Sequence, residues 1–130
     1  MSEALLLDTH ALLWALYSPG RLSSVVRTAL EDVSTAVHAS AVSAYEIALK
    51  HARGQLDFAA PLAADFLREI AVPGFESLAV KVHHAQRAGA LAMAHKDPWD
   101  RLLIAQAQSE GMVLVSNERL FDSLDVSRLW

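Results

Sequence analysis

Short apolar runs alternate along the chain with longer segments whose apolar residues have helical spacing, and this alternation strongly constrains the fold. Strand-like runs occupy residues 4–7, 35–39, 75–80, 112–115 and 126–130, the last as an edge strand or a tail. The segments between them carry apolar residues three or four positions apart, as amphipathic helices do. Strands that alternate with helices predict an α/β fold in which helices cover the faces of a parallel sheet.

The helical segments have recognisable ends. They are predicted at residues 9–17, 23–33, 40–53, 61–71, 81–90 and 97–111, with a short helical turn at 118–124. The clearest start is Asp97-Pro98-Trp99-Asp100, because Asp97 can cap the helix, Pro98 suits its first position and Asp100 favours its positive end. Glycines at positions 54 and 111 are suited to helix ends.

Length and composition restrict the classes of protein. At 130 residues the chain has the size of one domain, and we assign residues 1–130 to a single domain. No apolar run approaches the ~20 residues of a membrane span, and the N-terminus lacks the basic start of a secretory signal, so we expect a cytoplasmic protein. The absence of cysteine excludes thiolate metal sites, and the net charge of -4 predicts no broad basic face.

Several polar residues follow predicted strands. Asp8 follows the first strand, and Asn117 and Glu118 follow the strand that ends at Val115. Ligands of open α/β sheets bind outside the carboxyl ends of the strands, so these side chains can share a pocket. Asp97 and Asp100 open a helix and Glu46 lies inside another.

Each acid also has an ordinary structural interpretation. Asp8 and Asp97 can cap helices, and Asp100 can stabilise a helix start without any chemistry. Glu46 can pair with Lys50 four residues later, for only ~0.2–0.5 kcal/mol. Against this, Glu46 lies among strongly apolar neighbours, where an unpaired carboxylate is costly and a bound cation would remove the cost.

Four segments, taken together, resemble one known family. They read LLLDTHALLWAL from position 5, SAVSAYEIALKHARGQL from 40, HKDPWDRLLIAQAQSEG from 95 and LVSNERLFD from 114. In this order they resemble the PIN domains of VapC-type toxins nearly from end to end, most specifically in HKDPWDRLLIAQA. The resemblance implies a three-layer fold, in which a short, mostly parallel central sheet is flanked by helices.

The resemblance also assigns acidic positions. The first family acid falls on Asp8, the helical glutamate on Glu46, the third acid on Asp100, and a subgroup's additional acid on Asp97. The fourth position, usually Thr-Ala-Asp or Thr-Asn-Asp, here reads Ser116-Asn117-Glu118. The longer Glu118 can bind through a water, and Asp122 is a possible substitute.

What the resemblance implies is a Mg²⁺- or Mn²⁺-dependent ribonuclease that leaves a 5′ phosphate and a 3′ hydroxyl. Asp8 and Asp100 would bind the ion directly, while Glu46 and Glu118 would bind a second ion or orient water. It further implies an RNA substrate, a small VapB-type antitoxin that blocks the site, and commonly a toxin homodimer.

Other side chains are candidates for substrate contact. Phosphates can meet Arg101, Lys50, Arg53 or Lys96, although solvated surface charge is the simpler interpretation. His10 can contact substrate, and Ser116 and Asn117 accompany Glu118. Trp99 can stack on a base, although we expect both Trp14 and Trp99 to pack. Histidines 38, 51, 83 and 84 show no metal-ligand spacing.

Two rival functions remain to be compared. A PIN fold that binds RNA or a partner without cutting is compatible with Glu118 at the fourth position, although Asp8, Glu46 and Asp100 argue against it. Another Mg²⁺ phosphotransfer enzyme of similar topology would need a second Asp two residues after Asp8, where this chain has His10. No GxxxxGK[ST] run is present for a P-loop enzyme.

Overall fold

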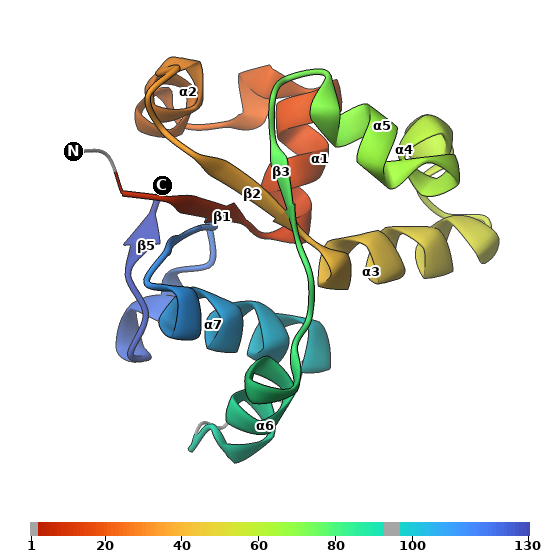
Figure 1. Ribbon diagram of the computed structural model, residues 1–130. Coiled ribbons are helices and arrows are strands. Elements are labelled where there is room, and N and C mark those ends of the chain that lie inside the picture. The colour runs from red at the N-terminus through yellow and green to blue at the C-terminus, as the bar shows by residue number, and fades with distance from the viewer. Residues whose placement is uncertain (1–2, 93–96) are drawn as a thin grey trace.

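The central sheet is parallel throughout the part of the chain that the computed structural model describes, residues 3–92 and 97–130. Its strands are β1 (Leu5–Leu7), β2 (Val37–Ser40), β3 (Glu76–Leu78), β4 (Val113–Val115) and β5 (Arg128–Leu129). They lie in the order β3-β2-β1-β4-β5 (Figure 1). The predicted strands are therefore confirmed in place and direction, with shorter bounds.

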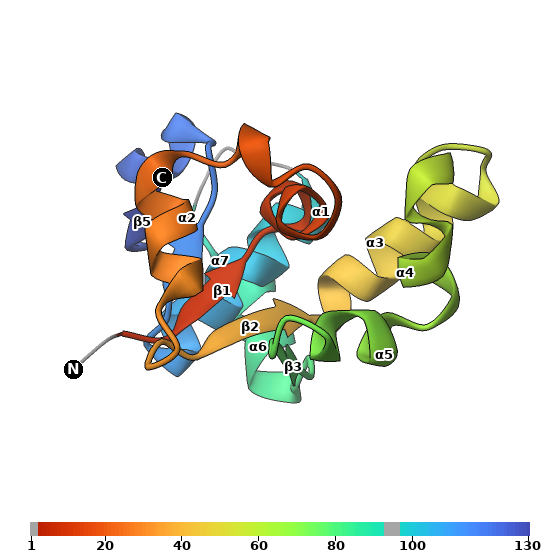
Figure 2. The same cartoon turned by 90° about the horizontal axis from the view of Figure 1, so that it is seen from above.

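Helices cover both faces of the sheet and complete three layers. They are α1 (Thr9–Tyr17), α2 (Ser24–Glu31), α3 (Ala41–Ala52), α4 (Ala60–Ala64), α5 (Phe66–Ala71), α6 (Val82–Ala90) and α7 (Pro98–Glu110). Short 3₁₀ turns are η1 (Pro19–Arg21), η2 (Asp57–Ala59) and η3 (Arg119–Ser123). Helices α1 and α2 lie on one face, and α6 and α7 lie on the other (Figures 1 and 2). The predicted α/β three-layer fold is confirmed.

The middle strand β1 is buried on both faces. Leu5 and Leu7 pack into a core with α1, α2 and the α3–α5 segment, whereas Leu6 packs into a second core with α7 and η3. This division follows from the alternation of side chains along a strand. Each fully buried leucine contributes about 1.5–3 kcal/mol relative to an exposed one, so both cores hold β1 in place. The carboxyl end of β1, where Asp8 follows, is therefore firmly positioned.

Helix caps account for several of the predicted boundaries. The side chain of Asp8 accepts a hydrogen bond from the Ala11 N–H at the start of α1, and Asp97 accepts one from the Trp99 N–H at the start of α7. At the other end of α7, Gly111 adopts φ +65, a conformation that glycine reaches without strain.

The predicted helix over residues 61–71 is wrong in one respect. The chain forms α4 and α5 in its place, separated at Asp65, whose backbone leaves the helical region with φ -148 and ψ 82. The Asp65 carboxylate accepts a hydrogen bond from the Arg68 N–H at the start of α5. Aspartate side chains compete in this way with the helical backbone, and a helix break results.

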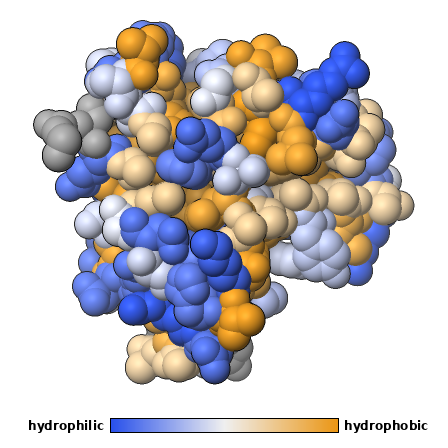
Figure 3. Space-filling model, in the orientation of Figure 1, coloured by the Kyte–Doolittle hydropathy of each residue, from blue (hydrophilic) through white to orange (hydrophobic). Residues whose placement is uncertain are grey.

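The surface is mixed in character. On the face seen in Figure 3, apolar side chains run across the middle, over β2 and β3, while hydrophilic ones gather below, over α6 and α7. Within residues 3–92 and 97–130, no helix combines the length and the hydropathy needed to cross a bilayer.

Candidate functional site

A cavity of about 150 Å³ lies where the chain leaves the carboxyl ends of β1 and β4. It is lined by Asp8, Thr9, His10, Glu46, Lys50, Asp97, Asp100, Asn117, Glu118 and Phe121. The structure thus brings together the five acids that the resemblance assigned to family positions. They come from four separate parts of the chain, which the parallel sheet brings to one edge.

Asp8 is the acid most affected by its surroundings. Its side chain is buried, and this loss of solvent raises the pKa of the carboxyl, with a further increase from the nearby charge of Asp100. Hydrogen bonds from the Ser116 hydroxyl and the Ala11 N–H oppose the rise in pKa without cancelling it. A buried carboxylate in this state would be stabilised by a cation.

Both carboxylate oxygens of Glu46 have partners. The Thr9 hydroxyl donates to Oε1 over 2.7 Å, and the Lys50 ammonium donates to Oε2 over 2.6 Å. Thr9 Oγ1 also lies 2.9 Å from Ser43 Oγ, so a row of buried hydroxyls fixes the position of Glu46. This arrangement suits a carboxylate that holds water or substrate beside an ion. Direct coordination by Oε2 would require Lys50 to move.

Thr9 and Ser43 are the polar residues of the site that the sequence did not reveal. Both are buried. A weak signal existed, since Ser43 precedes Glu46 by one helical turn and therefore lies on the same helix face.

Asp97 and Asp100 combine a capping position with a place in the cavity wall. Asp97 Oδ1 accepts from the backbone N–H of Trp99 at 2.9 Å and of Asp100 at 3.4 Å. The same two side chains line the cavity. The capping interpretation is therefore correct for Asp97, and it does not exclude a ligand role.

The loop after β4 carries the fourth family position. The buried Ser116 hydroxyl accepts a hydrogen bond from the Glu118 N–H at 3.0 Å and contacts Asp8. Glu118 reaches the cavity wall, and its Oε1 accepts from the Leu120 N–H. The loop thus connects the first and fourth acidic positions directly.

Asp122 does not line the cavity. It forms a two-pronged ion pair with Arg128, at 2.7 and 2.9 Å, and this pair lowers the pKa of Asp122. Arg128 also donates to the Ser116 carbonyl oxygen at 2.9 Å, which anchors the loop that carries Glu118. The geometry therefore favours Glu118 over Asp122 at the fourth acidic position.

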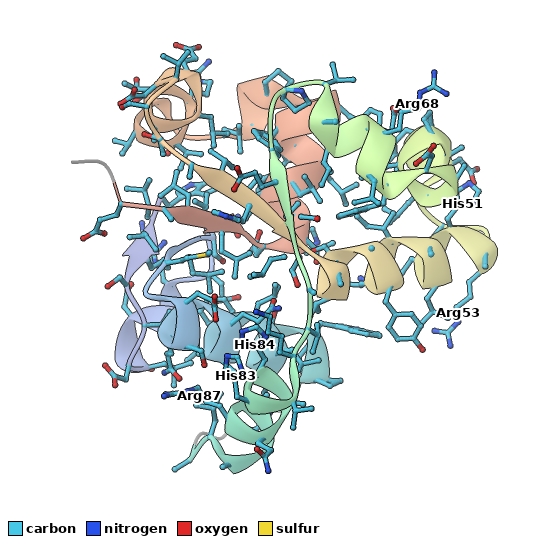
Figure 4. The ribbon with its side chains drawn as sticks, in the orientation of Figure 1. His51, Arg53, Arg68, His83, His84 and Arg87 are labelled. Carbon is cyan, nitrogen blue, oxygen red and sulfur yellow. The ribbon has the colours of Figure 1, made fainter. Side chains whose placement is uncertain are left out.

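The candidate substrate-binding residues divide into two groups. Lys50, His10 and Asn117 line the cavity, whereas Arg101 donates to the backbone carbonyls of Gly89 and Leu91 at the end of α6. Arg53 lies at the far end of α3 and points outward, as Figure 4 shows.

Two further candidates can be placed relative to the described chain. Lys96 falls outside the described residues. Trp99 packs edge-on against Tyr45, with 5.0 Å between the ring centroids, and also contacts the second core.

The donor set fits a hard divalent cation. Among the described residues, the lining offers five carboxylates, against the ammonium of Lys50 and the imidazole of His10. Oxygen donors of this kind are preferred by Mg²⁺ and Mn²⁺. Burial raises the pKa of Asp8, so a cation beside this carboxyl would stabilise its ionised form.

A second group of metal-ligand types lies on α6 and α7, where His83, His84 and Glu110 approach one another. Figure 4 shows the two histidines side by side on α6. The Lys81 N–H donates to His84 Nδ1, so the proton of the neutral ring lies on Nε2. Nε2 then donates to Glu110 at 3.0 Å, and this bond lowers the pKa of Glu110. The contact joins two helices by a hydrogen bond and occupies the nitrogen that a metal would need.

Solved structures with the same architecture include members of the VapBC family of toxin–antitoxin systems. VapBC2 from Rickettsia felis, bound to a promoter DNA fragment, superposes with a TM-score of 0.73 at 14% identity, covering 97% of each chain. DNA-bound VapBC from Salmonella typhimurium gives 0.71 at 17% identity, covering 99% of this chain and 98% of that one. FitAcB from Neisseria gonorrhoeae gives 0.66 at 18%, covering 97% and 96%.

Sequence comparison adds the family. A search of curated proteins found no significant relative. The model of the PIN domain family matches residues 5–126, a span that contains every acid of the cavity. The match covers nearly the whole chain, and the fold agrees with it, so the chain belongs to the PIN domain family.

Proposed function

We propose that this chain is a metal-dependent endoribonuclease that hydrolyses RNA phosphodiester bonds. The observation that carries the proposal is the convergence of Asp8, Glu46, Asp97, Asp100 and Glu118 on one small cavity. PIN domains are generally nucleases, which supports hydrolysis over binding alone. RNA as the substrate class rests on the resemblance to VapC-type toxins.

In this proposal the acidic side chains have different roles. Asp8 and Asp100 would hold the ion, and Asp97 lines the same cavity at the start of α7. When bound, Mg²⁺ or Mn²⁺ would polarise the phosphate and lower the pKa of the attacking water. Glu46, fixed by Thr9 and Lys50, and Glu118 orient that water, and the products are a 5′ phosphate and a 3′ hydroxyl.

Charge makes cation binding a condition for RNA binding. Clustered carboxylates repel a phosphate backbone, and the chain has a net charge of -4. Lys50 is the ammonium in the cavity wall, and it is paired with Glu46. The phosphate is therefore expected to enter only after the ion has neutralised part of the wall.

We further propose that the protein is the toxin of a VapBC-type module, with a VapB-type antitoxin as its partner and a homodimer as its own assembly. The similar structures are toxin–antitoxin complexes, which supports this assignment. An apolar groove of about 300 Å³ offers surface for a protein partner. It is lined by Ala41, Ala44, Phe66, Leu67, Ser77, Leu78 and Ala79.

The function is tested by incubating the purified chain with a mixed pool of structured and single-stranded RNA in Mg²⁺ or Mn²⁺. Parallel reactions contain a chelator, the Asp100→Asn variant, or the Asp122→Asn variant. Asp122 is a matched control, because it is an aspartate outside the cavity. End-group analysis of the fragments identifies which product carries the phosphate.

The expected result is metal-dependent cleavage that Asp100→Asn abolishes and Asp122→Asn retains. No cleavage of any RNA, together with no metal binding by calorimetry, would contradict the proposal. That outcome would favour the alternative of a PIN fold that binds RNA or protein without cutting.

A further inference from the structure

A row of aromatic rings begins at the wall of the acidic cavity. His10 lines the cavity and is exposed to solvent. Its ring stacks on that of Trp14, with 5.8 Å between the centroids and 26° between the planes. The two residues lie one turn apart on α1, so their side chains share one face of the helix.

The row continues away from the cavity. The Trp130 ring meets Trp14 at 5.7 Å with a tilt of 59°, and the Arg21 guanidinium lies 5.5 Å from the Trp14 ring centroid. Arg21 is exposed, and both tryptophans are partly exposed. Rings interleaved with a cation, next to a candidate nuclease centre, have the chemistry that binds single-stranded nucleic acid.

We propose that His10 and Trp14 form a base-stacking subsite for single-stranded RNA next to the acidic cavity. This inference rests on the proposed function, and it adds the residues that hold the bases of the substrate. A nucleotide adjoining the scissile phosphate meets His10 at the cavity wall. Its base extends the stack that His10 forms with Trp14, and Arg21 meets the backbone beyond. In a duplex the base faces are already stacked, so a paired substrate cannot use the subsite.

Because the protein is acidic, base stacking should contribute a large share of the free energy of RNA binding. Proteins that bind nucleic acid through phosphate contacts need many cations, whereas this chain has an acidic site and a net charge of -4. Each stacked base raises affinity by roughly 5- to 150-fold, with little dependence on which base it is. Arg21 alone would add about one phosphate contact, for which the expected slope of log K against log salt is about -0.7.

Packing is the competing explanation for Trp14, because its ring also contacts the first core. Packing alone does not account for the position of His10, which is exposed at the cavity and stacked on the same ring. A stacking subsite predicts that a strand without bases binds more weakly, whereas packing alone predicts no difference between the two strands.

The test measures fluorescence anisotropy of labelled ten-residue RNA oligomers with the parent protein in Ca²⁺, which takes oxygen ligands as Mg²⁺ does, and gel electrophoresis checks that the oligomers stay intact. One oligomer carries adenine bases, a second is abasic with the same number of phosphates, and a third is the adenine strand paired with its complement. Trp14→Leu and His10→Ala are then compared with Phe58→Leu, which removes an exposed ring outside the row.

The single strand should bind at least fivefold more tightly than the abasic strand or the duplex, and the slope of log K against log salt should be about -0.7. Trp14→Leu and His10→Ala should remove most of that preference, and Phe58→Leu should leave it unchanged. Equal affinity for base-bearing and abasic strands, or no binding of either, would overturn the proposal. This comparison is made with Trp14 intact, so it does not depend on how the Trp14 variant folds. If the protein prefers the base-bearing single strand but never cleaves RNA, the stacking subsite is supported and the proposed nuclease function is wrong.

Discussion

Lys50 Nζ lies 2.6 Å from Glu46 Oε2 in the wall of the acidic cavity. The carboxylate is buried, whereas the lysine remains 37% exposed and can therefore move out. An ion that entered the cavity would compete with the Lys50 ammonium for the negative charge of Glu46. Under the proposed function, Lys50 would be an internal counter-charge that limits metal affinity, and it would meet the phosphate.

Replacement of Lys50 by Met should strengthen metal binding and weaken cleavage. Two unit charges about 4 Å apart interact by about 1 kcal/mol even at the dielectric constant of water, so loss of the positive charge from the cavity wall should give roughly a fivefold gain in affinity. Calorimetric titration with Mn²⁺ measures this gain, and Lys50→Arg, which keeps the charge, is the control. An affinity that stays the same or falls in Lys50→Met would show that the two cations do not compete.

Variants at Asp97 separate its capping role from its charge. Asn also caps helices well, so Asp97→Asn should retain the stability of α7, whereas Asp97→Ala should lose about 1 kcal/mol of unfolding free energy. Both variants remove a carboxylate from the cavity and should weaken Mn²⁺ binding to a similar degree. Denaturant unfolding and calorimetry on the two variants provide the test. If Asp97→Asn binds metal with normal affinity, Asp97 serves only as a helix cap.

Asp8→Asn should make the metal-free protein at least as stable as the parent at neutral pH. Burial raises the pKa of Asp8 in the folded state above its unfolded value, so the folded protein binds more protons than the unfolded chain between those two pKa values. The contribution of Asp8 to stability is therefore complete below the unfolded pKa and is lost as pH rises through the folded pKa.

Thermal unfolding of parent and Asp8→Asn across this pH range, in chelator, tests the sign of the effect. Asn can keep the hydrogen bond from the Ala11 N–H, so the cap is not a confounding loss. The advantage of the variant should shrink as pH falls. A parent that becomes relatively more stable as pH rises would contradict the assigned cause.

Glu118 and Asp122 should differ in their effect on the ion. Glu118 lines the cavity, whereas Asp122 is engaged by Arg128. Glu118→Gln is expected to weaken Mn²⁺ binding or to slow cleavage, and Asp122→Asn is expected to keep metal affinity within about twofold of the parent, a difference below 0.5 kcal/mol. The reverse ranking would make Asp122 the fourth acid.

The sequence predicted the layers of the fold because each strand and helix has its own local pattern. Leu5, Leu6 and Leu7 are all apolar because β1 is covered on both faces, and Asp97-Pro98 defines a helix start locally. The break at Asp65 was missed, since apolar spacing continues across it and the aspartate acts only through its own hydrogen bond.

The sequence predicted the acids of the candidate site, whereas the contacts that support them were harder to predict. Asp8 and Glu118 follow strands whose carboxyl ends must meet, so their approach follows from topology. The pairing of Thr9 with Glu46 joins residues 37 positions apart, and that of Arg128 with the Ser116 carbonyl depends on the path of a loop. Such contacts are set by tertiary packing and carry no sequence periodicity.

The most direct test of the account measures Mn²⁺ occupancy and RNA cleavage in the same samples. As Mn²⁺ is titrated into the protein with a single-stranded RNA, bound ion and cleavage rate should rise together with one midpoint. Both should be lost in Asp100→Asn and kept in Asp122→Asn. Cleavage that persists in chelator or in Asp100→Asn, or metal that binds normally to Asp100→Asn, would contradict the assignment of the acidic cavity as the metal-dependent nuclease centre.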